Sequence, residues 1–132
     1  MRMFYALLFA LLFTFALWSG KTTFYAISDH TEETIIERVV DGDTFKTSDG
    51  RTIRLVNINA PEKDSPLSIQ SKNRLKEYEN KSVELEIVGT DKYDRLLARL
   101  YVPDYMNLKL VEEGLVSIFL VQSEERKLFA QA

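Results

Sequence analysis

Hydrophobic and polar positions alternate clearly between residues 34 and 59. TIIERVV (34–40) and TFKTS (44–48) are short apolar-polar alternations rich in β-branched residues, and this composition is typical of strands. Asp49 and Gly50 then predict a hairpin turn that leads into RTIRLVNIN (51–59). The first part of the pattern therefore predicts a three-stranded antiparallel meander.

The third strand is predicted to end near Pro61, which cannot donate a hydrogen bond to a continuing ladder, and a helix is predicted to follow. Ser65 has the residue type of an N-cap, and Pro66 suits the first helical position. The predicted helix covers about 66–79. Its expected inward residues are Leu67, Leu75 and Tyr78.

The rest of the chain predicts two more strands, KSVELEIVG (81–89) and LLARLYV (96–102), joined by the loop TDKYDR. A short helix, MNLKLVEE, ends at Gly114, and LVSIFLV (115–121) follows as a strand or extended segment. The last stretch, SEERKLFAQA, begins a further helix. Five principal strands with about three helices predict a mainly β fold with helices (α+β), namely a five-stranded Greek-key barrel of the oligonucleotide-binding type, the OB-fold.

The first 28 residues differ from the remainder, since Arg2 precedes an apolar run at 3–18 that only Thr14 interrupts. A positive start followed by an apolar run is typical of a signal peptide, whereas a membrane span usually needs about 20 apolar residues. Ala26 and Ser28 have the spacing of a weak cleavage site. A cleaved signal peptide and an uncleaved membrane anchor both remain open, and both place a domain at 29–132 outside the cytoplasm.

Charge and composition restrict the chemistry. Residues 29–132 retain 15 basic residues against 20 acidic ones, a formal charge of −5, so the domain is not a general polyanion binder. Any basic site for phosphate must be local. No cysteine is present, which excludes disulfides and thiolate metal sites, and the lone His30 is interpreted as a solvated linker residue.

Polar residues gather around the second and third predicted strands. Asp43, Asn59 and Glu62 are hard oxygen donors, which favour Ca²⁺ or Mg²⁺ over zinc or copper. Arg54 and Arg95 offer planar forks that can hold phosphate oxygens in pairs. Each residue alone has an ordinary interpretation: DGDT as a turn, Arg54 as a surface arginine, and Arg95 as a loop charge paired with Asp91 or Asp94.

Together these residues form a sequence of motifs in one order. DGDT occupies 41–44, R-L-x-x-I-x-A-P-E runs from Arg54 to Glu62, DKYDRLLA occupies 91–98, and N-x-x-L-V-x-x-G-L runs from Asn107 to Leu115. From about Ile35 to Val121 the chain resembles the thermonuclease family of staphylococcal-nuclease-like, Ca²⁺-dependent nucleases. The resemblance implies the same OB-fold barrel.

The resemblance also implies roles for individual residues. Asp43, Asn59 and the backbone carbonyl of Ala60 correspond to ligands of Ca²⁺, and Glu62 to the carboxylate that activates or orients water. Arg54 and Arg95 correspond to the arginines that hold the scissile phosphate. Tyr93 corresponds to a residue that contacts a neighbouring phosphate, and Asp41 to an acid behind the metal ligands.

The implied activity is hydrolysis of DNA and RNA to products ending in 3′-phosphates. Export is expected from the N-terminal segment, and a monomer is expected. Asn59 departs from the family, because an amide replaces a carboxylate and should weaken cation binding. Leu120 stands where an aromatic residue is usual, and the chain ends early in its last helix, which predicts lost packing. Two other functions stay open: a catalytically weak nucleic-acid-binding module anchored at the cell surface through residues 3–18, and a structural envelope protein.

Overall fold

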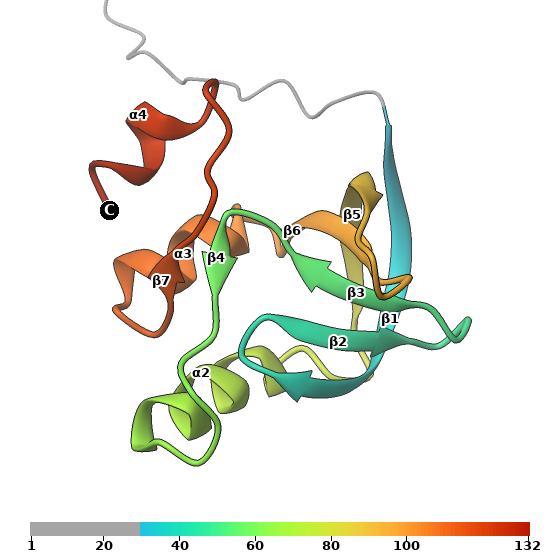
Figure 1. Ribbon diagram of the computed structural model, residues 1–132. Coiled ribbons are helices and arrows are strands. Elements are labelled where there is room, and N and C mark those ends of the chain that lie inside the picture. The colour runs from blue at the N-terminus through green and yellow to red at the C-terminus, as the bar shows by residue number, and fades with distance from the viewer. Residues whose placement is uncertain (1–29) are drawn as a thin grey trace, which may run out of the picture.

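The computed structural model describes residues 30–132 (Figure 1). The elements are β1 (Thr31–Asp41), β2 (Thr44–Thr47), β3 (Thr52–Leu55), β4 (Ile58–Asn59), α2 (Pro66–Lys76), β5 (Ser82–Thr90), β6 (Leu96–Tyr101), α3 (Met106–Glu112), β7 (Ser117–Ile118) and α4 (Arg126–Phe129). The predicted leader, with Ala26 and Ser28, lies outside the described residues. None of the helices within 30–132 has the length and apolar character that a membrane crossing requires.

Five strands close into a barrel in the order β1-β2-β3-β6-β5. The predicted meander is confirmed, since β1 pairs antiparallel with β2 and β2 with β3. Closure comes from β5, which pairs antiparallel with both β1 and β6, while β3 and β6 run parallel. The predicted OB-fold barrel with α+β character is thus confirmed.

The barrel interior is filled by large apolar side chains. Alternate residues of the strands point inward, as the two-residue period of a strand requires. The fully buried apolar residues of the barrel strands are Ile36, Phe45, Ile53, Leu55, Leu85, Ala98 and Leu100, and the core is completed by Ile58 of β4, Leu75 of α2 and Leu110 of α3. Asn107 is buried among them, where its side-chain amide donates to the carbonyls of Val56 and Ala98 and its Oδ1 accepts from the N–H of Leu100. This amide ties α3 to the ends of β3 and β6.

Helix α2 packs on the turn between β1 and β2. Ser65 caps the helix as predicted, because its Oγ accepts from the N–H of Ser68 at 3.1 Å. A Cβ at Gly42 would lie 2.7 Å from the Cβ of Ser71 and closer still to its Oγ. Only glycine therefore allows this approach. Leu67 was wrongly predicted to face inward and is 39% exposed: α2 contacts the barrel through Ser71 and Leu75, and its first turn stays in solvent.

We expect Gly42→Ala to lower the free energy of unfolding by about 1–3 kcal/mol, the usual cost of overpacking a close contact. Urea unfolding measures this cost. Combining it with Ser71→Gly should recover much of the loss, since both clashing atoms are then absent. A cost unchanged by the second substitution would contradict the assigned contact.

The third predicted strand, 51–59, is not continuous. The chain turns at Val56 and Asn57, and Asn57 has a left-handed backbone (φ 67°), which asparagine adopts more readily than most residues. The turn separates β3 from β4. Similarly, the strand predicted at 115–121 shrinks to β7, which pairs with β4, because Leu120 also has positive φ (47°) and leaves the ladder.

The C-terminal segment packs on the barrel despite the shortness of α4. Phe129 is 1% exposed and meets the ring of Tyr105 edge-on, with ring centroids 6.0 Å apart. The described part of this helix is therefore packed, and the predicted loss of packing beyond Phe129 stays a prediction. Gly114 ends α3 as predicted: it adopts φ 69°, and its N–H and that of Leu115 donate to carbonyls in the last turn of α3.

Glu125 connects this C-terminal segment to the β3–β4 turn. Its carboxylate accepts from Asn57 Nδ2 (2.7 Å), Tyr105 Oη (2.8 Å) and Arg99 Nη2 (2.8 Å). Burial, the largest influence, raises the pKa of Glu125, but the hydrogen bonds from Arg99, Asn57 and Tyr105 outweigh it and the net pKa is lowered. The charged carboxylate therefore stabilises the folded state.

We expect Glu125→Gln to lower the free energy of unfolding by about 1.5–3 kcal/mol at neutral pH, as for hydrogen bonds to a charged group. Because the folded pKa is depressed, the contribution is present above the unfolded value of 4.5 and is lost as pH falls through the folded value. Urea titrations at several pH values should show the two proteins converging in acid. A constant gap would contradict this role.

Candidate active site

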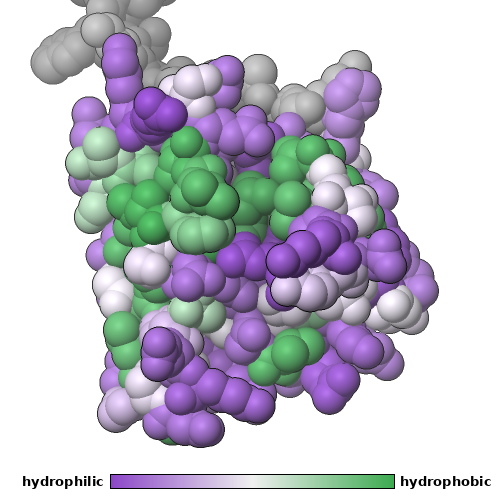
Figure 2. Space-filling view, viewed as in Figure 1, coloured by the Kyte–Doolittle hydropathy of each residue, from purple (hydrophilic) through white to green (hydrophobic). Residues whose placement is uncertain are grey.

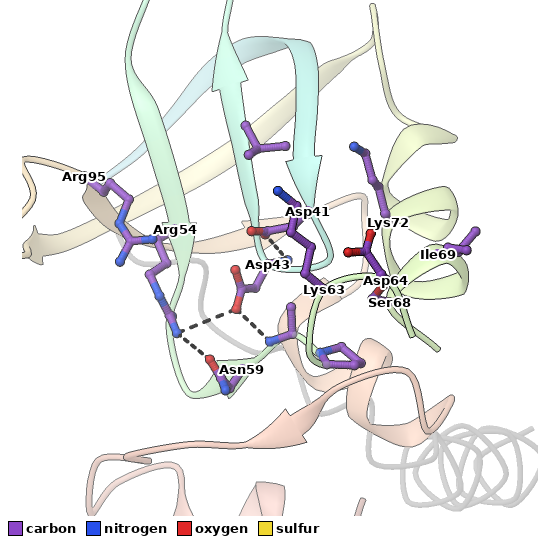
Figure 3. A pocket seen from close by; sticks show the side chains of 13 residues that line it. Asp41, Asp43, Arg54, Asn59, Lys63, Asp64, Ser68, Ile69, Lys72 and Arg95 are labelled. Atoms are coloured by element: carbon purple, nitrogen blue, oxygen red, sulfur yellow. Dashed lines mark hydrogen bonds and ion pairs between the residues drawn. The ribbon is translucent and has the colours of Figure 1, made fainter. Parts of the chain in front are cut away.

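Two adjoining hollows of about 670 and 620 Å³ share Arg54 and Arg95 in their linings. The two arginines come from neighbouring strands, since Arg54 is in β3 and Arg95 immediately precedes β6, its parallel partner. The first hollow also contains Asp41, Asp43 and Asn59, and Figure 3 shows both arginines on one side of these carboxylates. These five sequence-predicted residues are thus brought to one surface.

The turn between β1 and β2 presents the carboxylates. Asp43 is 5% exposed, and its Oδ2 accepts from the N–H of Ala60 at 2.7 Å, while its Oδ1 accepts from Thr44 Oγ1. The N–H of Asp43 donates in turn to Asp41 Oδ1 at 3.2 Å. These bonds join the DGDT turn to the segment after β4, which explains how residues 17 positions apart meet.

The surroundings of Asp41 disfavour its charged form. Partial burial, the largest cause, and then the neighbouring carboxyl of Asp43 raise the pKa of Asp41, although the N–H of Asp43 opposes this. A nearby cation would stabilise the charged forms of two such neighbouring acids. The arrangement therefore suits a hard cation or the cationic side chains beside it.

Arg54 is held rigidly over the first hollow. Its Nη1 donates to the carbonyls of Leu55 (2.8 Å) and Ile58 (3.3 Å), which spans the β3–β4 turn. Its Nη2 donates to Asn59 Oδ1 at 3.2 Å and lies 3.6 Å from Asp43 Oδ2. The guanidinium also lies 5.9 Å from the ring centroid of Phe119. Such restraint means that little side-chain freedom is lost when an anion binds.

Arg95 is oriented by the loop that carries it. Asp91 Oδ1 accepts from the N–H groups of Tyr93 and Arg95, and its Oδ2 accepts from Arg95 Nε at 2.7 Å. The predicted pairing with Asp91 is confirmed. It uses only Nε, and within residues 30–132 the terminal nitrogens of Arg95 have no hydrogen-bond partner. They remain available to an anion in either hollow.

Asn59 and Glu62 differ in their position relative to the first hollow. Asn59 lines the first hollow, where its amide oxygen accepts from Arg54. Glu62 is exposed and is absent from the lining of both hollows, so the structure does not bring its side chain to Asp43. Ala60 is held beside Asp43 by the hydrogen bond from its N–H to the Asp43 carboxylate. Across residues 30–132, no three carboxylate or imidazole side chains gather as a metal cluster.

The second hollow is mainly apolar. Tyr93, Val56, Leu97, Phe119 and Leu120 line it together with the two arginines. Tyr93 is 66% exposed, with its ring centroid 5.4 Å from the guanidinium of Arg95, and Leu120 is 80% exposed. Figure 2 shows a hydrophobic area on this side of the molecule, over the segment that follows β7. Flat apolar surfaces beside arginines suit a nucleobase attached to a phosphate.

Several residues that line the first hollow were not predicted from the sequence. Lys63, Asp64, Ser68 and Lys72 come from α2 and the loop before it. Ser68 and Lys72 lie four residues apart and so share a helix face, a spacing that could have identified them once α2 was known to pack beside DGDT.

A family model described as "staphylococcal nuclease homologue" matches residues 52–132. The chain belongs to the staphylococcal nuclease family. The match covers Arg54, Asn59, Glu62 and Arg95, whereas the DGDT turn lies before its start. It also extends beyond Val121, where the predicted resemblance ended.

Relatives of this nuclease-family chain include two bacterial proteins named "uncharacterized endonuclease". The one from Escherichia coli O157:H7 is 40% identical over 77 residues, which cover 55% of this chain and 50% of the relative. The one from Haemophilus influenzae is 34% identical over 86 residues, which cover 61% and 48% respectively. The chain thus spans about half the length of these curated relatives.

Proposed function

We propose that this protein is a phosphodiesterase that cleaves DNA and RNA. The observation that carries this proposal is the pair Arg54 and Arg95, which separates an acidic hollow from an apolar one. A nucleotide has the matching parts: a phosphate for the arginines and a base for the apolar hollow. Membership of the family and the endonuclease names of the relatives support it. The site, and not the barrel alone, supports the assignment.

The arginines stabilise the phosphate as its charge increases. Arg95 offers its terminal nitrogens, and Arg54 is fixed in place by backbone carbonyls, so both donors are positioned before the substrate arrives. Charge on the phosphate oxygens grows in the transition state of in-line attack. Preorganised donors therefore accelerate this step more than they strengthen ground-state binding.

The oxygen donors of the acidic hollow are suited to Ca²⁺, on which the family generally depends. Asp41 and Asp43 crowd each other, and hard carboxylate and amide oxygens are the ligands that Ca²⁺ prefers. Asp43 and Asn59, with the carbonyl of Ala60, would hold the ion, and Asp41 would support them. When bound, the ion would supply positive charge beside the phosphate.

In the proposed hydrolysis, a water oxygen bonds to phosphorus and the bond from phosphorus to the 5′-oxygen breaks. The proton of the water passes to the carboxylate of Glu62, and the leaving 5′-oxygen takes up a proton from solvent. The products then end in a 3′-phosphate and a 5′-hydroxyl. Glu62 must reach the site by movement of its exposed side chain, since it lines neither hollow.

A nucleic-acid-binding module with weak catalysis is the second candidate, favoured by the amide at position 59 and by the exposed position of Glu62. Incubating the purified protein with labelled single-stranded DNA, with Ca²⁺ and with a chelator, separates the two. Ca²⁺-dependent fragments support the enzyme. Retention of intact DNA in a binding assay supports the module. The absence of both cleavage and binding would favour a structural envelope role.

We expect Asn59→Asp to tighten Ca²⁺ binding by about tenfold or less, since it adds one anionic oxygen to the site. The new carboxylate would also pair with Arg54, which now donates to the amide. Isothermal titration with Ca²⁺ alone measures the affinity. An unchanged affinity would mean that position 59 is not a ligand.

Export is the proposed location of this activity, supported by the apolar run at 3–18 and the preceding Arg2. Fractionation of cells that produce the full chain, followed by immunoblotting, distinguishes a shortened secreted form from a full-length membrane-bound form. Full-length protein in the soluble cytoplasmic fraction would contradict both.

A further inference from the structure

The side of the acidic hollow opposite the arginines carries two lysines. Figure 3 shows Lys72 on α2 and Lys63 extending from the loop before α2 toward Asp41, both on the side of Asp43 that faces away from the arginines. Within residues 30–132 neither lysine is in a salt bridge, although Arg51, Arg74, Arg95 and Arg99 all are. These two cations thus face the hollow without a carboxylate partner.

The acidic hollow, named for its aspartates, has one more cationic than acidic side chain in its lining. Its cations are Arg54, Lys63, Lys72 and Arg95, and its acids are Asp41, Asp43 and Asp64. Asp64 lies on the same side as the lysines and opposes an anion there, but it is one acid against two bases. A cation bound by Asp41 and Asp43 would make the balance more positive.

A single phosphate does not need both the arginine side and the lysine side of the hollow. Arg54 and Arg95 already offer a site for the phosphate that reacts, and they lie across the carboxylates from the lysines (Figure 3). A second anion, linked to the first, would use Lys63 and Lys72. Ser68 Oγ donates to the carbonyl of Ser65, so it contributes no donor to this anion.

We infer that Lys63 and Lys72 form a second phosphate subsite, which holds the backbone of the next nucleotide of a single-stranded substrate. The inference rests on the proposed function and deepens it. A single strand fits, because the base in the apolar hollow must be unstacked while its backbone crosses the acidic hollow. Substrates longer than a dinucleotide are therefore preferred.

The test measures binding and cleavage of a labelled oligothymidylate of about eight nucleotides, within the range of about 4–16 that one such barrel occupies. Lys72→Gln should raise the dissociation constant roughly two- to fivefold, as for one solvent-exposed ion pair. The slope of log affinity against log salt should fall by about 0.7, as for the loss of one single-strand phosphate contact. The double variant K63Q/K72Q should show a larger fall.

Lys76→Gln is the matched control. It removes the same charge, and Lys76 lies one turn further along α2 and lines neither hollow. It should leave affinity and salt slope unchanged. In the cleavage assay, Lys72→Gln should reduce the advantage of the octanucleotide over a dinucleotide in KM, and Lys76→Gln should not. Equal effects of the two substitutions would overturn the subsite.

The two proposals fail in different ways. If the wild-type protein binds the oligonucleotide without cutting it, hydrolysis is refuted, while the binding comparison of Lys72→Gln with Lys76→Gln still decides the subsite. If it cuts the DNA and both variants match the wild type, the subsite is refuted alone. If it neither binds nor cuts, both proposals fall.

Discussion

Replacing Arg54 by Lys is expected to reduce kcat for DNA cleavage by about 10²–10³-fold, the usual cost of losing one preorganised donor to a developing anion. Lysine keeps the positive charge but cannot bridge Leu55, Ile58 and Asn59 as the guanidinium does. The rate should therefore fall more than the affinity for DNA. Single-turnover cleavage with saturating protein measures the step directly.

Two controls make this result specific. Arg74→Lys changes an arginine that pairs with Glu113 and lines neither hollow, so cleavage should be unaffected. Urea unfolding of Arg54→Lys shows whether the β3–β4 turn has been lost along with its bonds. A stable Arg54→Lys protein that cleaves at the wild-type rate would remove Arg54 from the proposed chemistry.

Replacing Glu62 by Gln is expected to reduce kcat by about 10²–10⁴-fold, the range for loss of a general base, while binding of DNA is largely retained. The substitution is nearly isosteric, and the side chain is exposed without a hydrogen-bond partner among the described residues. Stability should therefore not change. Cleavage and fluorescence anisotropy on the same preparation give both quantities.

Glu112→Gln is the matched control, since this exposed acid lies in α3 away from both hollows. An unchanged rate in Glu62→Gln would remove the proposed base. Asp41→Asn and Asp64→Asn would then decide between the other acids, because both side chains line the hollow. Loss of cleavage in one of them would transfer the role to that residue.

Much of the fold follows from local patterns. Alternation at 34–40 and 44–48, the Asp49-Gly50 turn and the Ser65 cap each act over a few residues, and the structure confirms all of them. Barrel closure depends on distant pairs such as β1 with β5, which the number of strands and the family resemblance indicated but no single motif determined.

Other features depend on contacts that no local pattern contains. Asn57 sits in an apolar run, and its left-handed turn is supported by Glu125, 68 residues away. Leu67 follows the helical period, but the glycine at 42 brings Ser71 to the barrel and leaves the first turn exposed.

The candidate site was also predicted only in part. Asp43, Arg54, Asn59 and Arg95 meet because β2, β3 and β6 are neighbours in the barrel, as hairpin pairing and the motifs suggested. Lys72 could not be predicted, since its position depends on how α2 packs against the β1–β2 turn. The position of Glu62 outside both hollows likewise depends on the conformation of a loop.

Hydrolysis at this site is tested most directly by analysing the ends that the purified protein produces from a 5′-labelled single-stranded oligonucleotide. With Ca²⁺, we expect labelled fragments that carry 3′-phosphates, formed far more slowly by Arg54→Lys and absent when a chelator is added. Intact oligonucleotide in the presence of Ca²⁺, or fragments whose yield does not depend on Arg54, would contradict it.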